Sequence, residues 1–239
     1  MNLRPSPDNK VHVANNGIFN SQEEAAKNAV QNSTAGAGPQ YFIYFPKANN
    51  TVSELVIAGY QNFLEGKNIG LTNAAVENNQ LLERYGVDGL SLDGHSRGSL
   101  TVRNSLESLI DAPDANGMAS GTHVQFYGPA ANAFGTDRTL GALQNRQNMT
   151  DQQQEAAVLQ YQNNIADPIG ILIGGNPATG GAISPGSDVS SEMLRAISGE
   201  AFTTHNGYGA GAEKCRAFWG GTTTSLPALV PATPDGSKK

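Results

Sequence analysis

The sequence predicts an α/β fold in which a mostly parallel sheet carries helices on both faces. Short apolar runs typical of strands alternate along the chain with longer segments whose apolar residues recur at helical spacing. The run at 40–45 is continuously apolar and aromatic, which is the pattern of a strand buried on both faces. The predicted strands cover residues 10–14, 40–45, 87–93, 122–129 and 158–163.

Helical periodicity fills the segments between these strands, and a polar segment at 132–155 predicts one or two surface helices. The remaining helices are predicted over 21–30, 52–64, 72–85, 99–110 and 190–197. The apolar segment 168–175 has two interpretations: a further buried strand, which we favour, or a loop that lines an acyl pocket or acts as a lid. We expect a single domain over 1–219 and a flexible tail over 220–239.

Composition excludes several classes of function. The chain has 239 residues and a net charge of −6, without the basic surface that nucleic-acid binding requires. The single cysteine, Cys215, excludes an intrachain disulfide and a thiolate metal site. No apolar run reaches the roughly 18 residues of a membrane span. The polar N-terminal stretch has no apolar core of a signal peptide, so we expect none in this chain.

The most informative motif is the pentapeptide Gly94-His95-Ser96-Arg97-Gly98, which has the form G-x-S-x-G. A strand pattern precedes it and a helix pattern follows it, which is the setting of a nucleophile elbow. Gly94 and Gly98 permit the close packing that such a turn demands. The sequence therefore predicts that Ser96 is a catalytic nucleophile.

A serine nucleophile needs a base, and the chain offers four histidines. His95 adjoins Ser96, but we expect its side chain to leave the turn in another direction. His12 and His123 lie in or beside predicted strands and are expected to be structural. His205 lies in a late loop beyond the predicted strands, so it is the predicted base.

The base needs an orienting carboxylate. Asp167 follows the 158–163 strand at its carboxyl end, and Pro168 comes directly after it. The resulting chain order, Ser96, Asp167, His205, is that of α/β-hydrolases. Asp137, in the segment after the preceding strand, is the alternative acid.

An oxyanion hole needs two preorganised N–H donors. The backbone amide of Arg97 lies at the predicted helix N-terminus, where amides have no intrahelical partner. The second donor is expected from the turn after the first strand, from the backbone of Gly17 or Ile18. A plain strand-to-helix turn is the alternative interpretation of that segment.

These residues together are similar to the lipase-like branch of the α/β-hydrolases. The likeness extends over about 11–219, and its most specific parts are the elbow and the segment Asp167-Pro168-Ile169. In that branch an Asp-Pro-Val/Ile segment after a strand bears the acid. The resemblance implies a triad of Ser96, His205 and Asp167 that needs no metal or organic cofactor.

More narrowly, residues 11–20, 92–99 and 174–177 resemble the C-terminal domains of filamentous-haemagglutinin-type exoproteins, including contact-dependent growth inhibition toxins. The resemblance implies export at the end of a larger bacterial surface protein, delivery into a neighbouring cell and an immunity protein as partner. Residues 76–79 match a short motif that precedes the toxic domain in that group, but here they fall inside a predicted helix.

The leading functional hypothesis is a serine hydrolase of carboxylic esters, with lipid or phospholipid esters favoured and transient contact with a membrane surface. Two alternatives stay open. One is a catalytically silent interaction or adhesin module that keeps a hydrolase-like frame. The other is an acyltransferase that uses the same three residues.

Overall fold

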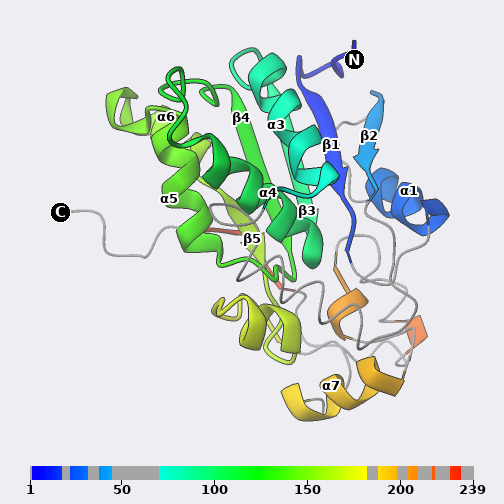
Figure 1. The fold of residues 1–239 in the computed structure, drawn as a ribbon. Coiled ribbons are helices and arrows are strands. Elements are labelled where there is room, and N and C mark those ends of the chain that lie inside the picture. The colour runs from blue at the N-terminus through cyan, green and yellow to red at the C-terminus, as the bar shows by residue number, and fades with distance from the viewer. Residues whose placement is uncertain are drawn as a thin grey trace.

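The computed structural model describes residues 2–17, 22–31, 38–44, 70–181, 188–198, 204–208, 217–218 and 227–232. These residues contain a six-stranded sheet in the order β2-β1-β3-β4-β5-β6 (Figure 1). Strands β1 to β5 are parallel, and β6 is antiparallel to β5. Their bounds are Val11–Asn15 (β1), Gln40–Ile43 (β2), Leu90–His95 (β3), Thr122–Tyr127 (β4), Gln160–Gln162 (β5) and Val230–Pro231 (β6).

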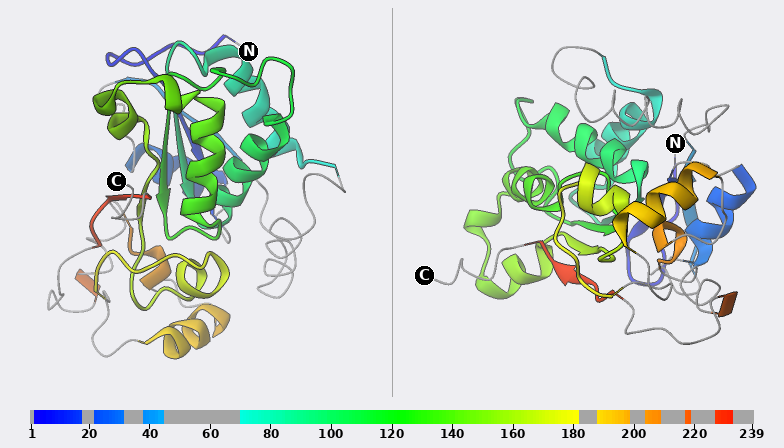
Figure 2. Two further views of the ribbon diagram at one scale, coloured as in Figure 1. Left: turned by 90° about the vertical axis from the view of Figure 1, so that its left-hand side faces the viewer. Right: turned by 90° about the horizontal axis from the view of Figure 1, so that it is seen from below.

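Helices cover both faces of the sheet, as Figure 2 shows, with α3, α4 and α5 on one side and α1 on the other. The predicted α/β architecture is therefore confirmed. The described helices are α1 (Gln22–Gln31), α3 (Asn73–Tyr85), α4 (Arg97–Leu109), α5 (Ala133–Leu143), α6 (Asp151–Ala157) and α7 (Val189–Ser198), with short turns η1 (Arg146–Asn148), η2 (Ile169–Ile173) and η3 (Thr204–Asn206). The predicted helix at 52–64 lies outside the described residues.

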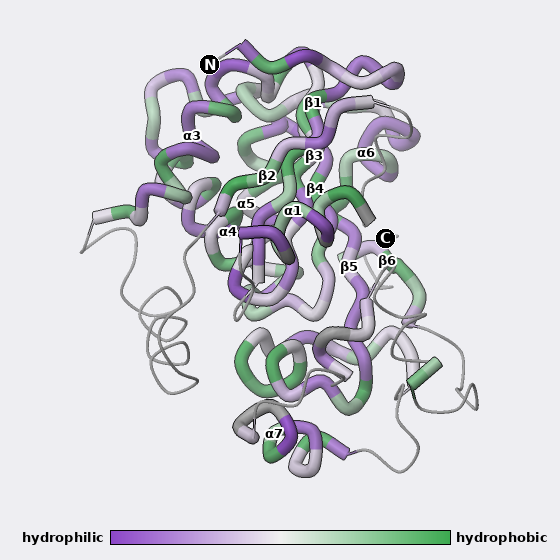
Figure 3. Tube along the Cα trace, turned by 90° about the vertical axis from the view of Figure 1, so that its right-hand side faces the viewer, coloured by the Kyte–Doolittle hydropathy of each residue, from purple (hydrophilic) through white to green (hydrophobic). Residues whose placement is uncertain are grey.

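Strand β3 shows why the sheet has two different faces. Leu90 and Leu92 are fully buried, and Gly94 continues their side of the strand against Ser99 of α4. Because side chains alternate along a strand, Ser91, Asp93 and His95 share the opposite face. Figure 3 shows apolar residues concentrated in the central strands, while α1 on the outside is largely hydrophilic. The α4 face is therefore the apolar core, and the other face of β3 carries polar groups.

The strand register brings the carboxyl ends of the central strands to one edge. Asn15 of β1 pairs with Gly94 of β3, and His95 pairs with Tyr127 of β4. Ligand sites of open α/β sheets form at this edge. Helix α7 and the turn η3 lie beyond the same edge in Figure 1.

Two segments differ from the sequence prediction. The 168–175 segment, for which a strand was favoured, contains the π-helical turn η2 instead. The Asp167 carboxylate accepts hydrogen bonds from the amides of Ile169 (2.9 Å) and Gly170 (3.3 Å), which coils the chain directly after β5. Within the 220–239 segment, expected to be a flexible tail, the described residues 230–231 form the edge strand β6, and the amide of Ala232 donates to the carbonyl of Leu159.

Candidate active site

Ser96 forms the turn between β3 and α4 in a conformation rare for a residue with a side chain. Its backbone angles are φ 54° and ψ −122°, and such a backbone persists only where its surroundings enforce it. The Ser96 amide donates to the carbonyl of Tyr127 (3.0 Å), and its carbonyl accepts from the Ser99 hydroxyl (2.6 Å). Neighbouring elements therefore hold the turn at both ends of the serine.

The two glycines of the pentapeptide lie where side chains would clash. A Cβ on Gly94 would lie 2.8 Å from the Cα of Ser99, and a Cβ on Gly98 would overlap the carbonyl oxygen of Asn15. The start of α4 thus packs directly on the ends of β1 and β3. This close approach places the Ser96 turn among the carboxyl ends of the central strands.

His205 and Asp167 form a buried pair on two separate loops. The His205 Nδ1 lies 2.9 Å from both carboxylate oxygens of Asp167. Asp167 is fully buried and His205 nearly so. Because a carboxylate accepts hydrogen bonds, Nδ1 carries the proton when the ring is neutral, and Nε2 holds the lone pair.

Tyr208 completes the surroundings of the Asp167 carboxylate. Its hydroxyl donates to Asp167 Oδ2 (2.5 Å) and accepts from the amide of Asn164 (2.9 Å). Gly128, at φ 51°, leaves room for both side chains, since a Cβ there would lie 2.5 Å from the Tyr208 ring. Burial raises the Asp167 pKa, but the His205 ring and the hydrogen bonds from His205, Tyr208 and Gly170 outweigh it and hold that pKa below its usual value.

His95 links the Ser96 turn to the His205 turn. Its Nε2 lies 3.1 Å from the His205 carbonyl oxygen, and the two rings stack with centroids 5.1 Å apart. The structure therefore brings the predicted base against the residue that precedes the predicted nucleophile. Ser96 Oγ and His205 Nε2 are both buried, and neither has a hydrogen-bond partner among the described residues.

The predicted oxyanion donors come from two turns that meet at Ser96. Arg97 is the first residue of α4 and directly follows Ser96. Gly17 lies against Ser96, since a Cβ on Gly17 would be 3.1 Å from the serine Cβ. The Gly17 carbonyl accepts from the Asn16 side chain (3.0 Å). The other predicted donor, Ile18, lies outside the described residues.

The alternative acid, Asp137, has a different partner. Both of its carboxylate oxygens accept from the Arg146 guanidinium at 2.9 Å, and Oδ1 also accepts from the amide of Leu159. This contact fixes α5 to the start of β5, so Asp137 has a structural role. His12 is similarly occupied, since its Nε2 contacts the Asp8 carboxylate at 2.9 Å.

Sequence reasoning missed three residues around this site. It placed no function on the His95 side chain and gave none to Tyr208. It also missed Glu192 of α7, a fully buried carboxylate that accepts from the Thr204 amide at 2.6 Å, next to His205. Strand alternation gave a usable signal for His95 alone, because it directs that side chain away from α4 and along the sheet face.

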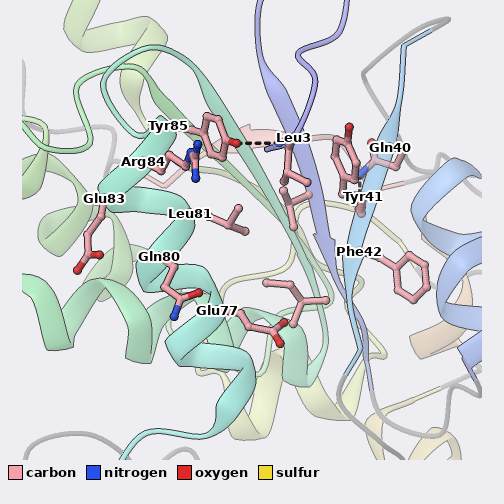
Figure 4. Close-up of a pocket in the computed structure, with 12 residues that line it drawn as sticks. Leu3, Gln40, Tyr41, Phe42, Glu77, Gln80, Leu81, Glu83, Arg84 and Tyr85 are labelled. Atoms are coloured by element: carbon pink, nitrogen blue, oxygen red, sulfur yellow. Dashed lines mark hydrogen bonds between the residues drawn. The ribbon is translucent and has the colours of Figure 1, made fainter. Parts of the chain in front are cut away.

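A cavity of about 710 Å³ lies elsewhere, between α3 and β2 (Figure 4). The side chains of Leu81 and Tyr85 project into it from α3, opposite Tyr41 of β2. Its lining includes none of the predicted site residues: Leu3, Val13, Gln40, Tyr41, Phe42, Ile43, Glu77, Gln80, Leu81, Glu83, Arg84 and Tyr85.

Comparisons with protein-family models, with curated proteins and with solved structures give no match. Within the described ranges, no three His, Cys, Asp or Glu side chains gather as a metal site would require. Nor does any helix in that part of the chain have the length and apolar character needed to cross a membrane.

Proposed function

We propose that the chain is a serine hydrolase that cleaves carboxylic esters through an acyl-enzyme. The observation that carries this proposal is the buried His205–Asp167 pair, whose histidine contacts His95, the residue directly before a serine held at a strained strand-to-helix turn. Nucleophile, base and orienting acid come from three segments far apart in the chain. Their chain order matches that of α/β-hydrolases.

In the proposed reaction, Ser96 Oγ attacks the ester carbonyl and His205 Nε2 takes the hydroxyl proton. Asp167 keeps the ring in the tautomer whose Nε2 is free to act as a base, and it stabilises the imidazolium that forms. The His205 proton then passes to the leaving alkoxide. Water attacks the acyl-enzyme by the same route and releases Ser96.

The oxyanion of each tetrahedral intermediate needs N–H donors on the Ser96 side of the site. We assign this role to the backbone amides of Arg97 and of the Gly17–Ile18 turn. The position of Gly17 beside Ser96 supports the assignment.

We propose acyl chains of lipid esters as the preferred substrates. Two apolar side chains near the acid support this choice: Ile165, in the loop before Asp167, is 58% exposed, and Leu172 of η2 is 62% exposed. Both residues lie within five positions of the proposed acid in the chain, and exposed apolar side chains suit contact with an acyl chain or a lipid surface.

The test compares hydrolysis of a water-soluble short-chain ester with that of phosphatidylcholine vesicles. We expect turnover of both, with vesicles preferred, and in Ser96→Ala a fall on the order of 10⁶-fold. Activity confined to short esters would remove the lipid assignment. Undiminished turnover by Ser96→Ala would remove the serine mechanism. Folded protein that cleaves neither ester would favour a silent interaction module.

A further inference from the structure

His95, the second residue of the pentapeptide, makes contacts that a surface residue of the elbow would not make. Its ring stacks on His205 at an interplanar angle of 23° and approaches the Tyr208 ring at a centroid distance of 6.1 Å. Its Nε2 meets the His205 backbone carbonyl at 3.1 Å. His95 therefore contacts both the ring and the main chain of the proposed base.

The protonation of His95 follows from these contacts. A carbonyl oxygen can only accept, so the His95 Nε2 carries the proton and donates it. Burial lowers the pKa of His95 to about 4, with the neighbouring His205 ring acting in the same direction. His95 is thus neutral near pH 7, with a defined tautomer.

We infer that His95 is a positioning residue, which holds the His205 turn beside the Ser96 elbow. Ser96 Oγ and His205 Nε2 do not hydrogen-bond each other here, so this placement sets how far the base must move to reach the nucleophile. This inference rests on the proposed function. Ser96 follows His95 directly, so a shift in the contact between His95 and His205 moves the base relative to the serine. Displacements of about 1 Å in such a geometry cost roughly 100-fold in rate.

A neutral ring suits this position better than a cation. In the proposed reaction His205 becomes an imidazolium, and a second positive charge stacked 5.1 Å away would oppose it. A neutral ring adds no such repulsion. His95 can therefore hold the base without raising the cost of its protonation.

The His205 turn has two further anchors, from other elements. The Glu192 carboxylate of α7 accepts from the Thr204 amide, and the Tyr208 hydroxyl donates to Asp167. These contacts fix the turn to α7 and to the loop after β5. His95 is the anchor that comes from the strand bearing the nucleophile, so it controls the distance that matters for proton transfer.

The test measures the second-order rate of Ser96 modification by a fluorophosphonate in wild type, His95→Gln and His95→Asn. The Gln amide nitrogen reaches roughly where Nε2 lies, whereas the shorter Asn amide does not. We expect His95→Asn to react roughly 10- to 100-fold more slowly than wild type and His95→Gln to recover most of the rate. Both variants replace the ring by an amide, so their difference isolates the contact with the His205 carbonyl.

A spectroscopic readout and a control complete the design. The downfield proton resonance of the His205 Nδ1–H should shift in His95→Asn and return toward its wild-type position in His95→Gln. His12→Gln, at a buried histidine of the neighbouring strand β1, should react like wild type. Equal rates in wild type and both His95 variants would overturn the positioning role, as would equal losses in the two. A wild-type protein that fails to react at all would instead overturn the proposed function.

Discussion

At the scale of single residues, Asp93 lies in surroundings that disfavour its charged form. It lies on β3 between Ala14 of β1 and Gln125 of β4, and its Oδ1 is buried without a hydrogen-bond partner in the described part of the chain. Burial raises the pKa of Asp93 from its usual 3.8 to about 7. The folded protein therefore favours the protonated carboxyl, whereas the unfolded chain ionises it at much lower pH.

The sign of the pH effect follows from this difference. As pH rises from about 4 to about 7, the unfolded state loses the Asp93 proton first, so the free energy of unfolding falls. Asparagine does not ionise, so Asp93→Asn removes this pH-dependent fall in the free energy of unfolding. From chemical denaturation at pH 5 and pH 8, we expect the stability of Asp93→Asn relative to wild type to rise by about 2 kcal/mol. The same relative stability at both pH values would show that the buried carboxyl does not titrate in this range.

Residue patterns predicted the position that follows directly from the end of a strand, but not the contacts that depend on how α7 and the η3 turn pack against the sheet. Asp167 was predicted because it directly follows a strand, and the edge of a parallel sheet gathers such residues. The contact of His95 with the His205 carbonyl and the Glu192–Thr204 hydrogen bond depend on how α7 and the η3 turn pack beyond the carboxyl ends of the strands. No periodicity in the sequence records such packing.

At the scale of elements, the junction of β3 and α4 combines close packing with backbone strain. Gly94 and Gly98 let the helix approach β1 and β3, and Ser96 takes up the unfavourable conformation between them. Local pattern predicted this junction well, since a strand, a G-x-S-x-G turn and a helix follow one another. It predicted η2 poorly, because an apolar run is equally compatible with a strand until Asp167 binds the next two amides.

Because the Ser96 backbone is strained, we expect glycine at position 96 to be more stable than alanine, the opposite of the usual order within a helix. Ser96→Gly should be more stable to denaturant than Ser96→Ala by about 1 kcal/mol, because glycine adopts a positive φ without a steric penalty. Within α4 the order should reverse, and Ser105→Gly should be less stable than Ser105→Ala by about 1 kcal/mol. If Ser96→Gly proves the weaker of its pair, the turn stores no strain.

In the molecule as a whole, two buried aspartates on neighbouring segments have separate roles. Asp137 pairs with Arg146 and fixes α5 to β5, whereas Asp167 pairs with His205 at the carboxyl edge. Asp137→Asn should therefore lower the free energy of unfolding by about 2 kcal/mol, because it leaves the Arg146 guanidinium without its carboxylate. The edge strand β6 lies beside β5, within a segment whose composition predicted a tail. Local pattern did not predict this strand because its pairing with Tyr161 of β5 defines it.

The central claim is that His205 and Asp167 activate Ser96. Its most direct measurement is the rate at which a fluorophosphonate modifies the folded protein, with the adduct located by peptide mass spectrometry. We expect a single adduct on Ser96 in wild type, the same rate in Asp137→Asn and a rate roughly 10³-fold lower in Asp167→Asn. Folded wild-type protein that stays unmodified at Ser96, or an Asp167→Asn variant that reacts at the wild-type rate, would contradict the claim.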